Sequence, residues 1–200
     1  MREAQSCDQF AALPFWEATE KLWPSRISPR RRDGMRVLFQ LMQERDARSI
    51  IETGTLRREN NWAGDGGMTW HFAQYCKRTG ARLLTIDNSR KALDVAKKVL
   101  GDVERVTFCE SDSVIALQRF DMPIDVLYLD SLDYDLDPRQ SQAHVMDEVF
   151  AARPHLHEKS IIAIDDCGFP DGGKGGLGVP YLSASGWTVA HPGYLTVLVR

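Results

Sequence analysis

The sequence predicts an α/β fold: a Rossmann-like, doubly wound sheet of seven mostly parallel strands that ends in an antiparallel hairpin. Short apolar runs alternate with helical segments five times between residues 49 and 184, which is typical of βα units in a parallel sheet. Two further runs, residues 187–192 and 194–200, are joined by a tight turn at Gly193, so we expect them to pair antiparallel. The 200 residues suffice for one such domain with a sizeable core.

We divide the chain into an N-terminal segment, residues 1–34, and a main domain, residues 35–200. The first segment mixes aromatic residues such as Phe15, Trp16 and Trp23 with charges and is broken by prolines. We therefore expect one or two short amphipathic helices that cap the domain or act as a lid. The same aromatic residues could equally serve a homodimer.

Every expected strand of the main domain contains Ile, Val or Leu, and residues 125–130 and 160–165 are rich in them. The expected strands are residues 49–53, 82–87, 105–110, 125–130, 160–165, 187–192 and 194–200. The expected helices are residues 36–45, 68–78, 91–100, about 114–120, 139–152 and 179–184. Gly80 is suited to end a helix, and Asn88 or Ser89 to begin one. We interpret the Gly-rich residues 168–178 as a flexible loop.

Composition limits the partners and the compartment. A formal net charge of -3 gives no field for nucleic acid, and we interpret the five arginines between Arg26 and Arg36 as a solvated turn or an anionic-substrate contact. We see no signal peptide and no apolar run that could span a bilayer, so we expect no membrane partner and a cytoplasmic location. Four scattered cysteines without CxxC spacing indicate free thiols in a reducing compartment.

Acidic residues follow two of the expected strands. Asp130 ends one, and Asp165 and Asp166 end the next. In neighbouring parallel strands these carboxylates would converge, and three of them cannot all stay ionised there without a cation, for which a hard divalent ion is suited. The alternative is that one residue of the Asp165–Asp166 pair caps a turn and the other is solvated.

A nucleotide-like ligand is indicated by Asp87, which ends the second strand after the glycine turn at Gly54, because such an acid can hold the hydroxyls of a ribose. A dinucleotide site would need G-x-G-x-x-G directly after the first strand, and Gly54 is followed by Thr55 and Leu56 instead. The one literal match, residues 173–178, lies after the fifth strand in the expected loop. No P-loop is present.

In their order and spacing, IETGT, TIDNS, CESDS, LYLDS, IAIDD and the terminal GWTVAHPGYLTVLVR resemble the class I S-adenosylmethionine-dependent methyltransferases. Within that class they are similar to the small metal-dependent O-methyltransferases that act on catechols, macrolide sugars and aminocoumarins. The resemblance covers residues 35–200. It implies S-adenosylmethionine and Mg2+, or another divalent cation, as cofactors.

The resemblance also implies roles for individual residues. The cofactor-binding residues that it implies are Glu52, Gly54, Thr55, Gly67, Thr69, Asp87, Asp112 and Ser113. Glu52 and Gly54 would line the methionine part, Asp87 the ribose, and Asp112 with Ser113 the adenine. The implied metal ligands are Asp130, Asp165 and Asp166. The sequence departs from the family by inserting residues 57–67 and by having Asp133 where catechol-type enzymes have a lysine.

The expected reaction is in-line transfer of the sulfonium methyl to a hydroxyl of a small molecule, with Mg2+ assistance. Asp133 is our first choice for the general base and His144 the second, although a lone histidine on a helix is more often structural. Trp62 could stack on the acceptor, whereas Trp70 fits the core. The alternatives are a different metal-dependent enzyme on this fold and a non-catalytic ligand-binding protein.

Overall fold

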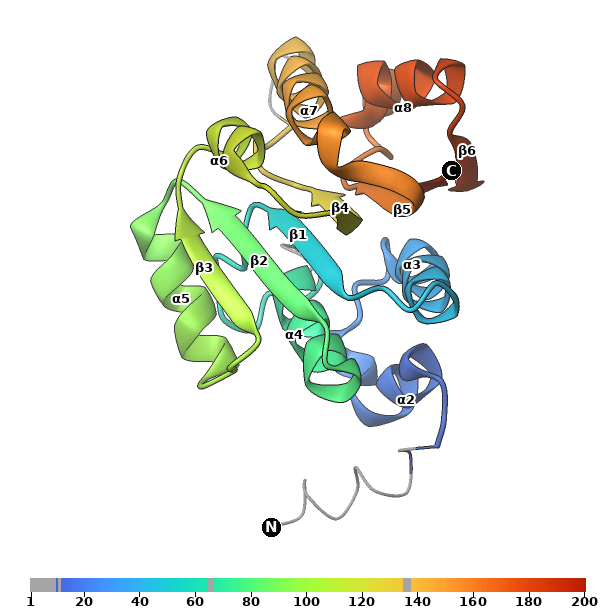
Figure 1. Cartoon of the computed structure of the whole chain (residues 1–200). Coiled ribbons are helices and arrows are strands. Elements are labelled where there is room, and N and C mark those ends of the chain that lie inside the picture. The colour runs from blue at the N-terminus through green and yellow to red at the C-terminus, as the bar shows by residue number, and fades with distance from the viewer. Residues whose placement is uncertain (1–9, 11, 65–66, 135–137) are drawn as a thin grey trace.

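A computed structural model describes residue 10 and residues 12–64, 67–134 and 138–200. Its strands are β1 (Ser49–Thr53), β2 (Arg82–Asp87), β3 (Val106–Glu110), β4 (Ile124–Leu129), β5 (Leu156–Ile164), β6 (Thr188–His191) and β7 (Thr196–Val199). They form one sheet in the order β3-β2-β1-β4-β5-β7-β6, in which only β7 runs antiparallel to its two neighbours (Figure 1). The predicted doubly wound sheet with a terminal hairpin is confirmed.

Helices cover both faces of the sheet. They are α2 (Phe15–Leu22), α3 (Arg32–Glu44), α4 (Met68–Thr79), α5 (Arg90–Leu100), α6 (Ser113–Arg119), α7 (Pro138–Ala152) and α8 (Gly175–Ala184), with short 3-10 turns at Pro24–Arg26, Arg153–His155 and Pro170–Gly172. In Figure 1, α2 to α5 lie on one side of the sheet, and α6, α7 and α8 lie on the other. Among the described residues, no helix has the length and apolar character needed to cross a membrane.

The apolar core is split by the sheet because successive strand residues point to opposite faces. Ile50 packs with the aromatic residues of α2, α3 and α4, whereas its neighbour Ile51 packs with apolar residues of α6, α7 and α8. Both isoleucines are almost fully buried, at 1% and 0% exposed. Burial on both faces explains why the central strands have continuous apolar runs instead of alternating patterns.

The N-terminal segment is packed into this core. The rings of Phe15 and Trp16 in α2 lie 4.9 and 6.2 Å from that of Phe39 in α3. The expected boundary between residues 34 and 35 falls inside α3, and Gly34 touches Leu195 of the terminal hairpin so closely that an added Cβ would lie 2.5 Å from its carbonyl oxygen. A division into a cap and a main domain therefore remains a proposal.

The Gly-rich residues 168–178 differ from our expectation of a flexible loop. They form the 3-10 turn Pro170–Gly172, and α8 begins at Gly175, earlier than the expected residue 179. Gln142 of α7 donates hydrogen bonds to the carbonyl oxygens of Asp171 and Gly173, at 3.1 and 2.9 Å. These side-chain contacts hold the turn and supply the order that a glycine-rich sequence lacks by itself.

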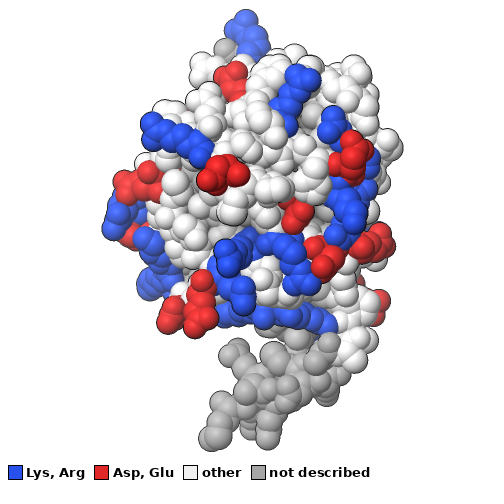
Figure 2. All heavy atoms as spheres, in the orientation of Figure 1, with Lys and Arg blue, Asp and Glu red and all other residues white. Residues whose placement is uncertain are grey.

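The two ends of the sheet differ in chemistry. Arg48, Arg82 and Arg105 lie at or next to the amino ends of β1, β2 and β3. On the face viewed in Figure 2, Lys and Arg side chains gather in the lower half, with Asp and Glu side chains at the margin of the group. Aspartates follow β4 and β5 at the opposite, carboxyl end of the sheet, and the order of the strands reverses between β1 and β4. Ligands bind at such a switch point in open α/β sheets.

Candidate functional site

A pocket opens at the carboxyl ends of the strands, at this switch point. Its lining residues are Gly54, Ile86, Asp87, Asn88, Ser111, Asp112, Ser113, Ser131, Leu132 and His144. Five of the predicted site residues thus meet in one pocket, namely Gly54, Asp87, Asp112, Ser113 and His144. Sequence reasoning missed the others because they are ordinary loop and strand residues.

Gly54 brings β1 and β4 together at the pocket. Its φ is +80°, and a Cβ at this position would lie 2.3 Å from the backbone oxygen of Asp130. Only glycine satisfies both conditions without strain. The Gly54 amide donates to Ile86 of β2, and the Asp130 amide donates to Thr53 of β1, so the strand ends stay in register up to the pocket.

Asp87 is held in place by two backbone amides. Its Oδ2 accepts a hydrogen bond from the Thr55 amide at 3.1 Å, and its Oδ1 accepts one from the Ser89 amide at 2.7 Å. The side chain therefore has a fixed orientation at the rim of the pocket. A carboxylate at the end of the second strand is the group that binds ribose hydroxyls in folds of this kind.

The far wall of the pocket is formed by α6 and α7. Asp112 caps α6 by accepting a hydrogen bond from the Ile115 amide at 3.0 Å. Ser113 Oγ lies 3.1 Å from His144 Nε2, which is also 3.4 Å from Oε1 of the buried Glu148. Contact with Glu148 raises the pKa of His144 above its ordinary value. His144 thus belongs to the wall next to Asp112 and Ser113, where the adenine was expected.

The remaining four predicted cofactor residues do not line this pocket. Glu52 is buried in β1 and accepts a hydrogen bond from Thr85 Oγ1 at 2.7 Å, and burial raises its pKa to about 8. Thr69 accepts from the Leu56 amide at 2.8 Å, and its hydroxyl lies 3.4 Å from that of Thr55. Gly67 packs against Trp62. These contacts hold the segment after β1, and a direct role of the four residues in cofactor binding stays a prediction.

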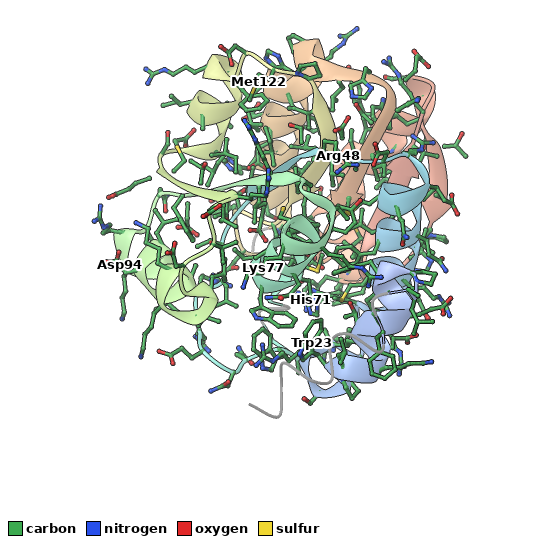
Figure 3. All side chains as sticks on the ribbon, turned by 60° about the horizontal axis from the view of Figure 1, so that its bottom comes forward. Trp23, Arg48, His71, Lys77, Asp94 and Met122 are labelled. Atoms are coloured by element: carbon green, nitrogen blue, oxygen red, sulfur yellow. The ribbon has the colours of Figure 1, made fainter. Side chains whose placement is uncertain are left out.

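The segment inserted after β1 is closed by an aromatic cluster. The ring of Trp70 lies 5.7 Å from Trp62 and 5.0 Å from Trp23, and the Arg26 guanidinium lies 4.4 Å from the Trp70 ring. Figure 3 shows Trp23 and His71, labelled, close together where the N-terminal segment meets α4. Trp70 is buried, in agreement with the prediction. Trp62 packs on this cluster, so its predicted stacking on an acceptor lacks support from these contacts.

The three aspartates implied as metal ligands do converge, but two basic side chains lie among them. Lys174 Nζ is 2.5 Å from Asp130 Oδ1 and 3.0 Å from Asp166 Oδ2. Arg31 Nε is 2.6 Å from Asp165 Oδ2, and its Nη2 is 3.2 Å from Asp166 Oδ1. The expected clustering of the carboxylates is therefore present, and Arg31 and Lys174 supply the compensating charge that we expected from Mg2+.

The geometry of this cluster does not fit a divalent cation. Besides the ion pairs, Asp165 accepts hydrogen bonds from the Tyr128 hydroxyl and from the Asp166 amide, both at 2.9 Å. A cation between Asp130 and Asp166 would have to displace the ammonium of Lys174 or lie against it, and both arrangements are unfavourable in a buried site. Among the residues that the structure describes, no group of three or more His, Cys, Asp or Glu is suited to hold a metal.

Asp133, the predicted general base, lies outside the cluster and is exposed. Its Oδ2 accepts a hydrogen bond from Arg57 Nη1 of the inserted segment at 2.8 Å. Asp133 is separated from Asp130 by Ser131 and Leu132, which both line the pocket. The acidic residues Asp135 and Asp137 lie outside the described residues.

Comparisons with known proteins concern the family and the fold of the chain. A family model described as a methyltransferase domain matches residues 63–167, which include β2 to β5. A search of curated proteins finds no match.

Among solved structures, CalS11, a TDP-rhamnose 3′-O-methyltransferase of calicheamicin biosynthesis, has a TM-score of 0.61 and 16% identity over 99% of this chain and 93% of its own. The methyltransferase PaMTH1 of Podospora anserina, solved with SAH, has a TM-score of 0.58 and 16% identity over 99% of this chain and 93% of its own. NSun6 of Pyrococcus horikoshii, solved with SFG, has a TM-score of 0.61 and 16% identity. The matched region covers 82% of this chain and 50% of the NSun6 chain. At these identities the likeness concerns the fold.

Proposed function

The chain belongs to the methyltransferase-domain family and uses S-adenosylmethionine, and on that premise we propose that it methylates a hydroxyl group of a small molecule. The observation that carries the proposal is the pocket at the ends of β1 to β4, in which the Asp87 carboxylate is fixed by the amides of Thr55 and Ser89.

The proposed cofactor orientation follows the chemistry of the pocket walls. The ribose hydroxyls bind Asp87, and the adenine lies between α6 and α7 beside Asp112, Ser113 and His144. The methionine part extends past Gly54 toward Thr55 and Glu52. This orientation points the sulfonium methyl toward the end of β4, where Asp130 and Ser131 lie.

The acceptor and the reaction are proposed on the same basis. An acceptor oxygen attacks the methyl carbon in line, the carbon–sulfur bond breaks with its electrons going to sulfur, and S-adenosylhomocysteine leaves. The acceptor's proton passes to a base, for which Asp133 remains the candidate because it follows the pocket residue Leu132 on the same segment. The similarity of nearly the whole chain to CalS11, a sugar O-methyltransferase, supports a hydroxyl acceptor.

Several earlier expectations remain as proposals or lose support. A small-molecule acceptor, rather than nucleic acid or a membrane, and a cytoplasmic location stay part of the proposal. Assistance by Mg2+ is not supported, because Arg31 and Lys174 already pair with its expected ligands. The alternative of another metal-dependent enzyme is not supported either, because it needs the same three aspartates as metal ligands. The alternative of a non-catalytic ligand-binding protein is disfavoured by the match to the methyltransferase-domain family model.

Calorimetric titration with S-adenosylmethionine and S-adenosylhomocysteine tests the proposal. We expect micromolar binding that Asp87→Ala weakens at least about tenfold, equivalent to about 1.4 kcal/mol. The matched control is Asp102→Ala, an exposed aspartate in the loop after α5, which should bind as the native chain does. Incubation with S-adenosylmethionine and a panel of sugars, catechols and other hydroxyl compounds then tests transfer. Absence of binding, or transfer to nitrogen acceptors alone, would refute the proposed function.

A further inference from the structure

We propose that this methyltransferase needs no divalent cation, because the ammonium of Lys174 and the guanidinium of Arg31 permanently occupy the carboxylate cluster formed by Asp130, Asp165 and Asp166. The inference deepens the proposed function and rests on it. Lys174 is in this view a positioning residue, which fixes the Asp130 carboxylate next to the cofactor pocket.

The position of the ammonium is the first argument. Lys174 Nζ bridges Asp130 Oδ1 and Asp166 Oδ2, at 2.5 and 3.0 Å, and so joins the ends of β4 and β5. The Lys174 side chain is fully buried, at 1% exposed. A divalent ion that used these two carboxylates would compete for the same space and the same oxygen atoms.

Arg31 supplies the second positive charge that compensates the three carboxylates. Its guanidinium contacts Asp165 and Asp166, donates to the Gly64 carbonyl at 3.0 Å, and lies 4.8 Å from the ring of Tyr194. Arg31 therefore links the N-terminal segment, the inserted segment and the terminal hairpin to the cluster. Three carboxylates and two fixed cations leave one formal negative charge, which suits a neighbouring sulfonium cation.

The Gly-rich turn is shaped to hold Lys174 in this position. Gly173 has a φ of +55°, and a Cβ there would lie 1.8 Å from the carbonyl oxygen of Asp166. An added Cβ at Gly176 would lie 2.3 Å from both the Asp171 carbonyl oxygen and Gln142 Nε2. The turn thus needs glycine to pack on the end of β5, and this packing directs the lysine side chain into the cluster.

The cluster also touches the cofactor pocket. The backbone oxygen of Asp130 lies against Gly54, and Ser131 lines the pocket directly. The carboxylate that Lys174 holds is consequently one residue away from the pocket wall. The ammonium fixes the orientation of the Asp130 carboxylate. A coordinated metal ion would otherwise have this role.

Metal titration of the native chain tests the proposal. The purified protein is treated with a chelator, desalted and titrated with Mn2+ to millimolar concentration, with free Mn2+ followed by electron paramagnetic resonance. We expect no saturable site, and an affinity for S-adenosylhomocysteine that Mg2+ and chelator change by less than about twofold. Saturable Mn2+ binding that Asp130→Asn abolishes would overturn the proposal. Binding that persists in Asp130→Asn lies elsewhere and agrees with it.

The variant Lys174→Met gives a second readout. If it folds, the three carboxylates retain only Arg31, and we expect it to gain one Mn2+ site that neither the native chain nor the exposed control Lys159→Met has. A folded Lys174→Met without Mn2+ affinity would contradict the claim that the ammonium fills a cation position. If Lys174→Met does not fold, the native titration decides. Failure of every sample to bind S-adenosylhomocysteine would instead count against the proposed function.

Discussion

The ammonium of Lys174 lies 2.5 Å from the carboxylate of Asp130, and the Lys174 side chain is fully buried. The two residues come from a glycine-rich turn and from the end of β4, and Asp166 at the end of β5 shares the same ammonium at 3.0 Å. The two acidic partners raise the pKa of Lys174 above its ordinary value and outweigh the effect of burial, so the lysine stays charged.

Lys174→Met should destabilise the fold strongly, because it leaves buried carboxylates without their partner. We expect the free energy of unfolding to fall by about 3–5 kcal/mol in chelator, measured by urea denaturation. The exposed control Lys159→Met should change it by less than about 0.5 kcal/mol. Millimolar Mn2+ should restore part of the loss in Lys174→Met alone. A loss as small as that of the control would show that the ion pair does not contribute.

Gly173→Ala should be more damaging than the same change at the neighbouring Gly172. Both glycines have positive φ, +55° and +78°, so both substitutions carry backbone strain of about 1–2 kcal/mol. An added Cβ meets nothing within 4 Å at Gly172, whereas at Gly173 it overlaps the Asp166 carbonyl oxygen. The overlap should cost about 1–3 kcal/mol more. Equal urea midpoints for the two variants would mean that the turn can move away from β5 freely.

The pH dependence of stability should reveal the buried Glu52. Burial raises its pKa from 4.5 to about 8, so between these values the folded chain binds a proton that the unfolded chain releases. The free energy of unfolding should therefore fall as pH rises through this window, by about 1.4 kcal/mol per unit at most. Glu52→Gln stays uncharged and keeps an acceptor for Thr85, so it should remove this decline and exceed the native chain in stability near about pH 8.

The control for Glu52 is Glu44→Gln, an exposed glutamate in the last turn of α3. Its urea midpoints should follow those of the native chain at every pH. If Glu52→Gln shows the same slope as Glu44→Gln, the carboxyl group of Glu52 is not the source of the dependence.

Much of the fold could be predicted because its signals are local. Runs such as residues 49–53 and 82–87 have Ile and Leu residues at their centres, and they form β1 and β2 with the expected bounds. Parallel order then placed Asp130 beside Asp165 and Asp166, so the clustering of acids followed from topology. Asp87 was predicted from its place at the end of a strand, whereas Asp112 and Ser113 were implied by the resemblance to class I methyltransferases.

The partners of that cluster could not be predicted in the same way. Arg31 is one of five arginines within residues 26–36, and only the path of the N-terminal segment selects it. Lys174 lies in a run of glycines that has no periodicity, and the contacts of Gln142 and Asp166 that order this run are tertiary. One signal was available: three converging carboxylates need positive charge, and lysine or arginine can supply it as well as a metal.

Glu148→Gln should lower the pKa of His144, which can be followed by NMR titration of the imidazole ring. His144 Nε2 lies 3.4 Å from the buried Glu148 carboxylate, which raises the pKa of the histidine despite partial burial. The stabilisation of the fold by this contact is complete below the unfolded pKa of about 6.5 and is lost as pH rises through the higher folded value.

The control Asp147→Asn removes an exposed acid that acts on His144 more weakly, so the pKa shift of His144 should be smaller in this variant. Equal shifts in the two variants would indicate a general charge effect and would remove Glu148 from its specific role. Because His144 lines the proposed cofactor pocket beside Ser113, we also expect the affinity for S-adenosylhomocysteine to lose part of its pH dependence in Glu148→Gln.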